Sequence, residues 1–115
     1  MKNKKSFIAI LDGESCLSKK RAISEIAICL KFPDEFGENL DALEDYLNDL
    51  SWIESEIVVL VIKNISQFLS DEENTLKGTF FSIFNDAKSE EYEGESELEK
   101  KEFYIFYSDS LYEAS

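Results

Sequence analysis

The apolar residues of the chain form short runs that predict strands. Two runs lie at residues 6–11 and 103–107, and residues 57–62 are six consecutive aliphatics. The middle run has no polar position on either face, which is typical of a central strand in a parallel sheet that is covered on both sides. We therefore expect residues 57–62 to form the centre of the core.

Between these runs, apolar residues recur with the spacing of helices. Ser18 is placed to cap a helix over residues 19–30 that Pro33 brings to an end, and Asn39 is placed to cap a second helix. Asp41 lies in the first turn of the second helix, where a negative charge interacts favourably with the helix dipole. The buried stripe of this helix is expected to consist of Leu40, Leu43, Leu47 and Leu50.

Further helical segments are predicted after the middle strand. Residues 64–69 suit a short helical turn, and Ser70 with Glu73 has the spacing of a capping box that opens a longer helix toward Lys88. Gly78 within this helix costs about 1 kcal/mol relative to Ala. The inner face of the helix is expected to consist of Leu76, Phe80, Ile83, Phe84 and Ala87.

This order of strands and helices predicts an α/β fold. Each parallel strand needs a helical crossover before the next, so we expect a three-stranded parallel sheet packed with about four helices. The length suits one small domain over residues 1–115. Residues 1–5 and 109–115 are expected to be flexible ends, and residues 89–102 an acidic, solvated loop.

The net charge of the chain limits the partners that it can bind. Its 115 residues include 25 Asp and Glu against 12 Lys and Arg, a net charge of −13. Such a charge repels nucleic acid and anionic membranes, because both are bound through Lys and Arg. We therefore expect a basic protein partner and no direct binding of nucleic acid or membrane.

The residue types also argue against most catalytic sites. The chain contains no histidine, which removes the commonest general base and most catalytic zinc sites. Cys16 and Cys29 have no metal-type spacing and are expected to be free, unreactive thiols. The N-terminus lacks the apolar region of a signal peptide, and no stretch reaches the length of a membrane span. The sequence favours a cytoplasmic protein that is not an enzyme and needs no metal or cofactor.

The negative charge is concentrated in one part of the chain. Nine acidic residues lie from Asp34 to Glu56, an interval without Lys or Arg. Asp41, Asp45 and Asp49 follow one another at intervals of four and share a helix face opposite the leucines. Like charges at this spacing destabilise a helix by about 0.2–0.5 kcal/mol per pair. An unscreened acidic face on a rigid helix is suited to filling a cationic cleft.

Two other uses of these acids are weaker. Asp41 and Asp45 could act as an acid/base pair or hold Mg²⁺, but the chain has no Gly-rich phosphate loop and little volume for an enclosed pocket. A metal-dependent enzyme is therefore a minor alternative. Mimicry of DNA predicts a broad spread of charge, whereas the acids concentrate on one helix and one loop.

Residues 32–47 carry a family resemblance. They read FPDEFGENLDALEDYL and resemble the signature of the barstar family of intracellular ribonuclease inhibitors, whose core is P-x-x-[aromatic]-G-E-N-L-D-A-L-x-D. The likeness covers most of residues 5–108, and the predicted order of elements agrees with the family's fold. The later residues that correspond are Trp52, Gln67, Phe68, Ile83, Phe84, Ala87 and Lys88.

The resemblance implies a function for the loop and the second helix. In the family they plug the active site of a secreted microbial ribonuclease, with carboxylates in place of RNA phosphates. Asp45 matches the family's dominant contact, and Asp41 matches the second. The chain would then be an immunity protein that binds one basic ribonuclease toxin, one to one. The other matched positions are Phe36, Gly37, Asn39, Leu40 and the peripheral Asp86.

Two positions depart from the family pattern. Glu35 stands where the family has a tyrosine that packs on the enzyme, and Glu44 replaces a tryptophan on the second helix. Exchanging two aromatic anchors for two charges favours a different and more basic cleft. A toxin of another activity, such as a DNase or tRNase, is therefore an open alternative.

Several matched residues also have structural explanations. Gly37 suits a tight turn with positive φ, and Asn39 suits a helix cap. Phe36 suits either packing against the core or an exposed anchor for a partner. Trp52 is expected to pack at the boundary of the core.

Overall fold

The computed structural model describes residues 5–89 and 101–109. Three strands form one parallel sheet, in which the second strand lies between the other two. The strands are β1 (Ser6–Asp12), β2 (Ile57–Lys63) and β3 (Glu102–Tyr107). The predicted three-stranded parallel sheet, with residues 57–62 at its centre, is confirmed.

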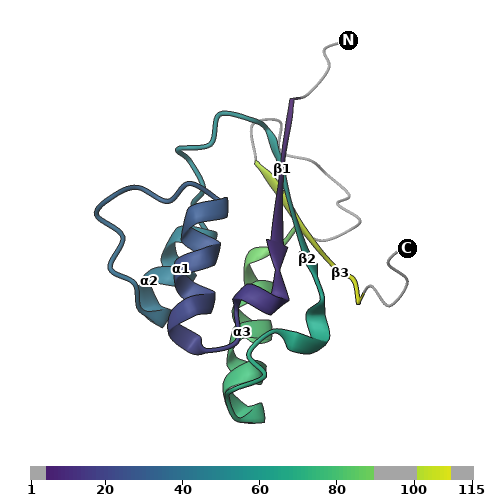
Figure 1. Cartoon of the computed structure of the whole chain (residues 1–115). Coiled ribbons are helices and arrows are strands. Elements are labelled where there is room, and N and C mark those ends of the chain that lie inside the picture. The colour runs from purple at the N-terminus through teal and green to yellow at the C-terminus, as the bar shows by residue number, and fades with distance from the viewer. Residues whose placement is uncertain (1–4, 90–100, 110–115) are drawn as a thin grey trace.

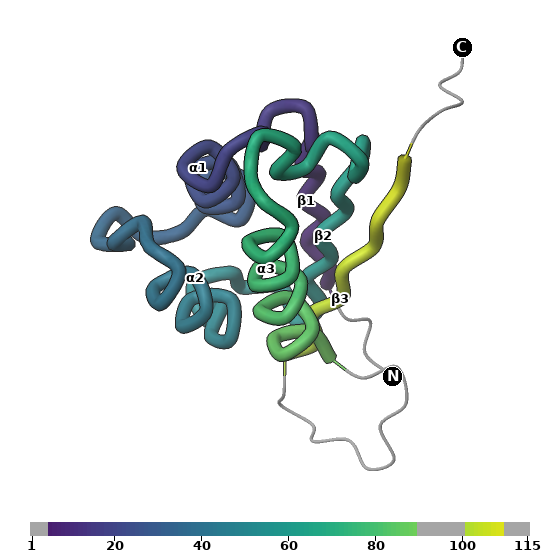
Figure 2. Tube along the Cα trace, turned by 90° about the horizontal axis from the view of Figure 1, so that it is seen from below, coloured from purple at the N-terminus to yellow at the C-terminus, as the bar shows by residue number. Residues whose placement is uncertain are grey.

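All α-helices of the described chain lie on one face of the sheet, as Figures 1 and 2 show from two directions. They are α1 (Lys19–Cys29), α2 (Leu40–Leu47) and α3 (Asn74–Ala87). The strands follow one another across the sheet in the order β1-β2-β3. Right-handed crossovers that advance in one direction place every connecting helix on the same side.

The small α/β fold is as predicted, but the number of helices is lower. The described ranges contain three α-helices where about four were expected. The predicted helical turn at residues 64–69 is a short 3-10 helix, Ile65–Gln67. The segment between β2 and α3 is therefore mostly irregular.

The predicted capping box at the start of α3 is wrong. The helix begins at Asn74, and Glu73 precedes it without a side-chain cap. The backbone before α3 makes tertiary hydrogen bonds in place of helical ones. The amides of Leu69 and Asp71 donate to the carbonyls of Cys16 and Leu17. The Glu72 carboxylate accepts a hydrogen bond from the Lys19 amide, at the start of α1. These long-range bonds delay the start of α3.

Helix α1 begins at Lys19, as predicted, and ends at Cys29, close to the predicted end at about residue 30. The Ser18 hydroxyl accepts a hydrogen bond from the Arg21 amide, which confirms its role as N-cap. At the other end, Lys31 adopts a left-handed conformation with φ 57°, and the Phe32 amide donates to the Ala27 carbonyl. This is the Schellman arrangement, which closes the helix before Pro33 is reached.

The sheet is covered on the helix side alone within the described part of the chain. Along β2 the inward side chains Val58, Leu60 and Ile62 are fully buried, whereas Ile57, Val59 and Val61 on the other face are half-buried. On the outer face, Ile8 and Phe106 remain 62% and 57% exposed. The expectation that the middle strand is covered on both sides is therefore wrong, because the crossovers place every helix on one side.

The two cysteines are free, as expected. Burial raises the pKa of both the Cys16 and the Cys29 thiol to about 12, so both stay protonated and unreactive at neutral pH. Within residues 5–89 and 101–109, no helix has the length and apolar character needed to cross a membrane.

Most of the predicted acidic loop, residues 90–100, and the predicted ends at 1–4 and 110–115 lie outside the described residues. The residues that border the loop are well anchored. The Ser89 amide donates to the Phe103 carbonyl at 2.7 Å, and the Lys101 ammonium donates to the carbonyls of Ile53 and Ser55. Both borders are thus fixed to the body of the domain.

Substitutions at two glycines, one in a crowded site and one in an open site, test the packing of the fold. In Gly13→Ala the new methyl group would collide with the backbone carbonyl of Asn64, so we expect the free energy of unfolding to fall by about 1–3 kcal/mol or more. In Gly78→Ala the methyl group meets open space in a helix, so the free energy should rise by about 1 kcal/mol. Urea unfolding of both variants measures the difference, and equal effects would contradict the described contacts.

Candidate functional site

Helix α2 is fixed at its start by Asn39. The Asn39 side-chain oxygen accepts a hydrogen bond from the Ala42 amide at 2.8 Å, and its side-chain nitrogen donates to the Gly37 carbonyl at 3.5 Å. The predicted N-cap is confirmed. The cap ties the helix to the loop before it, so the two share one local structure.

The leucines of α2 anchor one side of the helix. Leu43 and Leu47 are buried, and Leu40 is half-buried. Leu50 is also buried but lies beyond the helix, in a left-handed conformation with φ 52°. The predicted stripe is thus correct in burial, but it is shared between the helix and the turn that follows.

The opposite side of α2 is acidic and exposed. Asp41, Glu44 and Asp45 all lie on the surface, and we call these three residues the acidic face. Asp49, predicted to continue this face, lies after the last helical residue, where its carboxylate accepts a hydrogen bond from Ser51. Two aspartates separated by one turn therefore remain on the helix, with Glu44 beside them.

The loop before α2 places its residues in two environments. The Phe36 amide donates to the Pro33 carbonyl at 3.0 Å and closes a turn, with Glu35 exposed. The Phe36 ring is half-buried and packs against Phe32 and Tyr46. Of the two roles left open for Phe36, the structure therefore supports packing.

The positive φ in this loop does not fall on the glycine. Gly37 has an ordinary negative φ, whereas Glu38 is left-handed with φ 53°. The prediction that Gly37 serves a turn with positive φ is therefore wrong. A Cβ added to Gly37 would lie 3.5 Å from the Asn39 side-chain nitrogen, which is ordinary contact.

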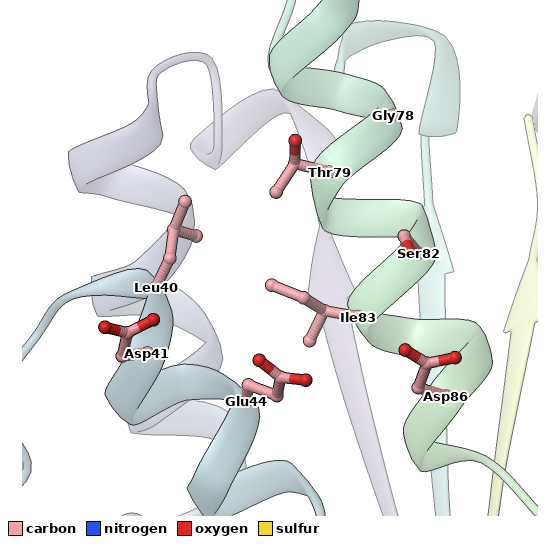
Figure 3. Close-up of a pocket in the computed structure, with 8 residues that line it drawn as sticks. All are labelled: Leu40, Asp41, Glu44, Gly78, Thr79, Ser82, Ile83 and Asp86. Carbon is pink, nitrogen blue, oxygen red and sulfur yellow. The ribbon is translucent and has the colours of Figure 1, made fainter.

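A hollow of about 480 Å³ lies between parts of α2 and α3, and Figure 3 shows the side chains that line it. Glu44 and Ile83 point toward one another across this space, and Asp86 extends from the α3 side. We call this site the acidic hollow. Its lining consists of Leu40, Asp41, Glu44, Gly78, Thr79, Ser82, Ile83 and Asp86.

Among the described residues, the acidic hollow is lined by three carboxylates and by no Lys or Arg. A neighbouring hollow of about 310 Å³ also includes Asp86, but Lys88 and Lys101 line it as well. The two hollows thus differ in charge although they share one residue. The first is a place where a cation from outside would find acceptors.

The structure brings together four of the residues predicted to bind a partner, and leaves five outside the hollow. Leu40, Asp41, Glu44 and Asp86 line it. The remaining five lie in the loop before α2 or elsewhere on that helix: Glu35, Phe36, Gly37, Asn39 and Asp45. The predicted set therefore spans the hollow and the adjoining loop.

On the α3 side of the hollow, Asp86 was predicted as a site residue, whereas Gly78, Thr79, Ser82 and Ile83 were not. Gly78, Ser82 and Asp86 are spaced by four residues, so they form one face of small and acidic side chains. This spacing in the sequence predicts a helix face with small side chains, over which a hollow can form. The sequence does not show which helix lies opposite.

The described residues contain no group of three or more Cys, Asp or Glu side chains placed to hold a metal ion. Asp41 and Glu44 border an open hollow, and both carboxylates are exposed. The hollow is open to solvent and does not enclose a small substrate.

A family model matches most of the chain. Residues 6–108 match the family model described as Barstar (barnase inhibitor). The matched range runs from the first residue of β1 to the residue after β3, so it includes every strand and helix given above. No curated protein matches the chain.

The cap of α2 can be tested separately from binding. Asn39→Ala removes the acceptor for the Ala42 amide, so we expect the free energy of unfolding to fall by about 1 kcal/mol. Asn39→Asp keeps an acceptor at the same place and should stay within about 0.5 kcal/mol of the wild type. Thermal or urea unfolding measures both, and equal losses in the two variants would argue against the cap.

Proposed function

The chain belongs to the barstar family of barnase inhibitors, and from that premise we propose that it is an immunity protein that blocks a ribonuclease toxin. It acts in the cytoplasm, binds the toxin one to one, and covers the cationic active site with α2 and the loop before it. The observation that carries this proposal is the exposed acidic face beside a hollow without Lys or Arg.

The acidic face is suited to replacing RNA in a ribonuclease cleft. Asp41 and Asp45 are one helical turn apart on a helix whose other side is fixed by Leu43 and Leu47. The helix that carries both aspartates is therefore fixed before binding, so only the two short side chains have to be ordered in the complex. Negative groups at fixed spacing can occupy the sites where Lys and Arg of the enzyme hold phosphates.

The acidic hollow adds a contact that an aromatic residue at position 44 would remove. Glu44 and Asp86 approach the hollow from different helices, with Gly78 and Ser82 leaving space between them. In the proposed complex this space receives one basic side chain from the toxin. Glu35 on the exposed loop adds further charge, so the fitting enzyme has a cleft more basic than that of barnase.

The same surface also fits a nuclease that cleaves DNA or tRNA, because every such enzyme binds phosphates through cationic groups. The family match favours a ribonuclease. A metal-dependent enzyme is the weaker alternative, since its two aspartates would stand on an exposed helix face beside an open hollow.

Charge removal on the acidic face tests the proposal. Asp45→Asn and Asp41→Asn keep the shape of the side chains and should each weaken binding by about 2–5 kcal/mol, at least about 30-fold, because a cationic group of the toxin loses its partner. RNA cleavage is titrated with the chain, using barnase and any basic ribonuclease that co-purifies with the chain.

The control for these variants is Glu14→Gln, which changes an exposed acid in the short 3-10 helix Gly13–Ser15 after β1. It changes the net charge equally but should leave inhibition unchanged. Inhibition that is as strong in Asp41→Asn and Asp45→Asn as in the wild type would show that the binding surface is elsewhere.

Salt dependence tests the electrostatic part of the proposal. Raising the NaCl concentration from about 0.05 to 0.5 M should slow association by tenfold or more, because exposed charges act mainly on encounter. Dissociation should change much less. Stopped-flow mixing with the toxin measures both rates, and an association rate independent of salt would count against plugging by charge.

A further inference from the structure

Four aromatic side chains pack together behind the loop that precedes α2, and we propose that they hold this loop in its binding conformation before a partner arrives. We call them the aromatic cluster: Phe32, Phe36, Tyr46 and Trp52. The inference rests on the proposed function, because it concerns the same binding surface.

The rings of the aromatic cluster are in mutual contact. The ring centroids of Phe32 and Phe36 are 4.7 Å apart, and those of Phe36 and Tyr46 are 5.2 Å apart. Trp52 lies 5.4 Å from both Phe32 and Tyr46. These distances and the inclined planes of the rings suit favourable aromatic pairs. All four rings are half-buried, and Phe32, Phe36 and Trp52 pack against the buried core, so the cluster lies between the loop and the core.

The cluster joins segments on both sides of the loop. Phe32 stands where α1 closes, with its amide bonded to the Ala27 carbonyl. Tyr46 belongs to the last turn of α2, and Trp52 follows that helix. The Trp52 indole N–H donates to the Leu30 carbonyl at 3.0 Å, which ties the end of α1 to the segment after α2. Phe36 is the member of the cluster that the middle of the loop contributes.

The loop conformation needs such support. Glu38 is held at φ 53°, which is unfavourable for a residue with a side chain. Such a conformation persists when the surroundings determine it. Asn39 fixes the end of the loop through the helix cap, and the cluster fixes its middle through Phe36. Without the ring contacts, the turn from Pro33 to Phe36 is held by one backbone hydrogen bond.

An ordered loop strengthens binding without touching the partner. When the binding conformation is populated only in part, the apparent affinity falls in proportion to that fraction. Tyr46 follows Asp45 directly in α2, so the cluster also fixes how the helix is turned relative to the loop. Loop and acidic face therefore keep one relative geometry.

Phe36 alone cannot test this role, because a ring at the binding surface could also contact the toxin directly. Phe32 separates the two explanations, since it contacts Phe36 from the end of α1. If Phe36 acts only as an anchor for the toxin, losing the Phe32 ring leaves binding unchanged. If the cluster positions the loop, losing either ring has the same kind of effect.

The first measurement is hydrogen exchange in the free, full-length chain. In Phe32→Leu and Phe36→Leu we expect the amides of Phe36 and Ala42 to exchange about tenfold faster, while the amide of Leu60 in β2 stays protected. The matched control is Phe81→Leu, which removes a half-buried ring in contact with Phe68, Phe84 and Tyr107. Loop amides that respond equally in the control, or not at all in Phe32→Leu, would overturn the inference.

The second measurement is binding to the ribonuclease that the wild-type chain inhibits. Phe32→Leu should weaken binding about tenfold with the salt dependence of association unchanged, since no charge is lost. Wild-type affinity in Phe32→Leu, despite a faster-exchanging loop, would overturn the positioning role and leave the proposed function intact. A wild-type chain that inhibits no ribonuclease would overturn the proposed function itself, and this inference with it.

Discussion

The direction in which the strands are added to the sheet determines the rest of the molecule. Because β1, β2 and β3 follow one another across the sheet, right-handed crossovers place α1, α2 and α3 on one face. The inner face of a three-stranded sheet has limited room for helices. Helix α2 contacts α3 on one side only. Much of its remaining surface stays open, and a hollow lies between the two helices. The acidic face occupies the surface that this crowding leaves free.

The stability of α2 must come from its surroundings. It has eight residues, too few for a stable isolated helix, and its acidic face adds repulsion between like charges. Burial of Leu43 and Leu47 and the Asn39 cap offset both effects. The acidic face lowers the stability of this short helix, and the fold does not need it. Binding of a partner therefore explains the acidic face better than folding does.

The sequence predicted the parts that local patterns determine. Apolar runs identified the three strands, and the caps Ser18 and Asn39 identified the starts of two helices. The start of α3 was mispredicted because it depends on hydrogen bonds to residues more than fifty positions away. The α3 side of the hollow and the aromatic cluster depend on which elements meet in space. Periodicity shows which side of a helix is polar, but not what lies opposite.

The chain separates apolar from charged residues in a way that fits the proposed complex. Glu35 and Glu44 are exposed, while Phe36 and Tyr46 pack together in the aromatic cluster. In the proposed complex, aromatic contacts order the loop and exposed charges meet the partner. An inhibitor built in this way depends on complementary charge for recognition, because few apolar groups remain on its binding surface. Its specificity would then be set by where the cations of a nuclease cleft stand, since a misplaced cation leaves a buried carboxylate unpaired.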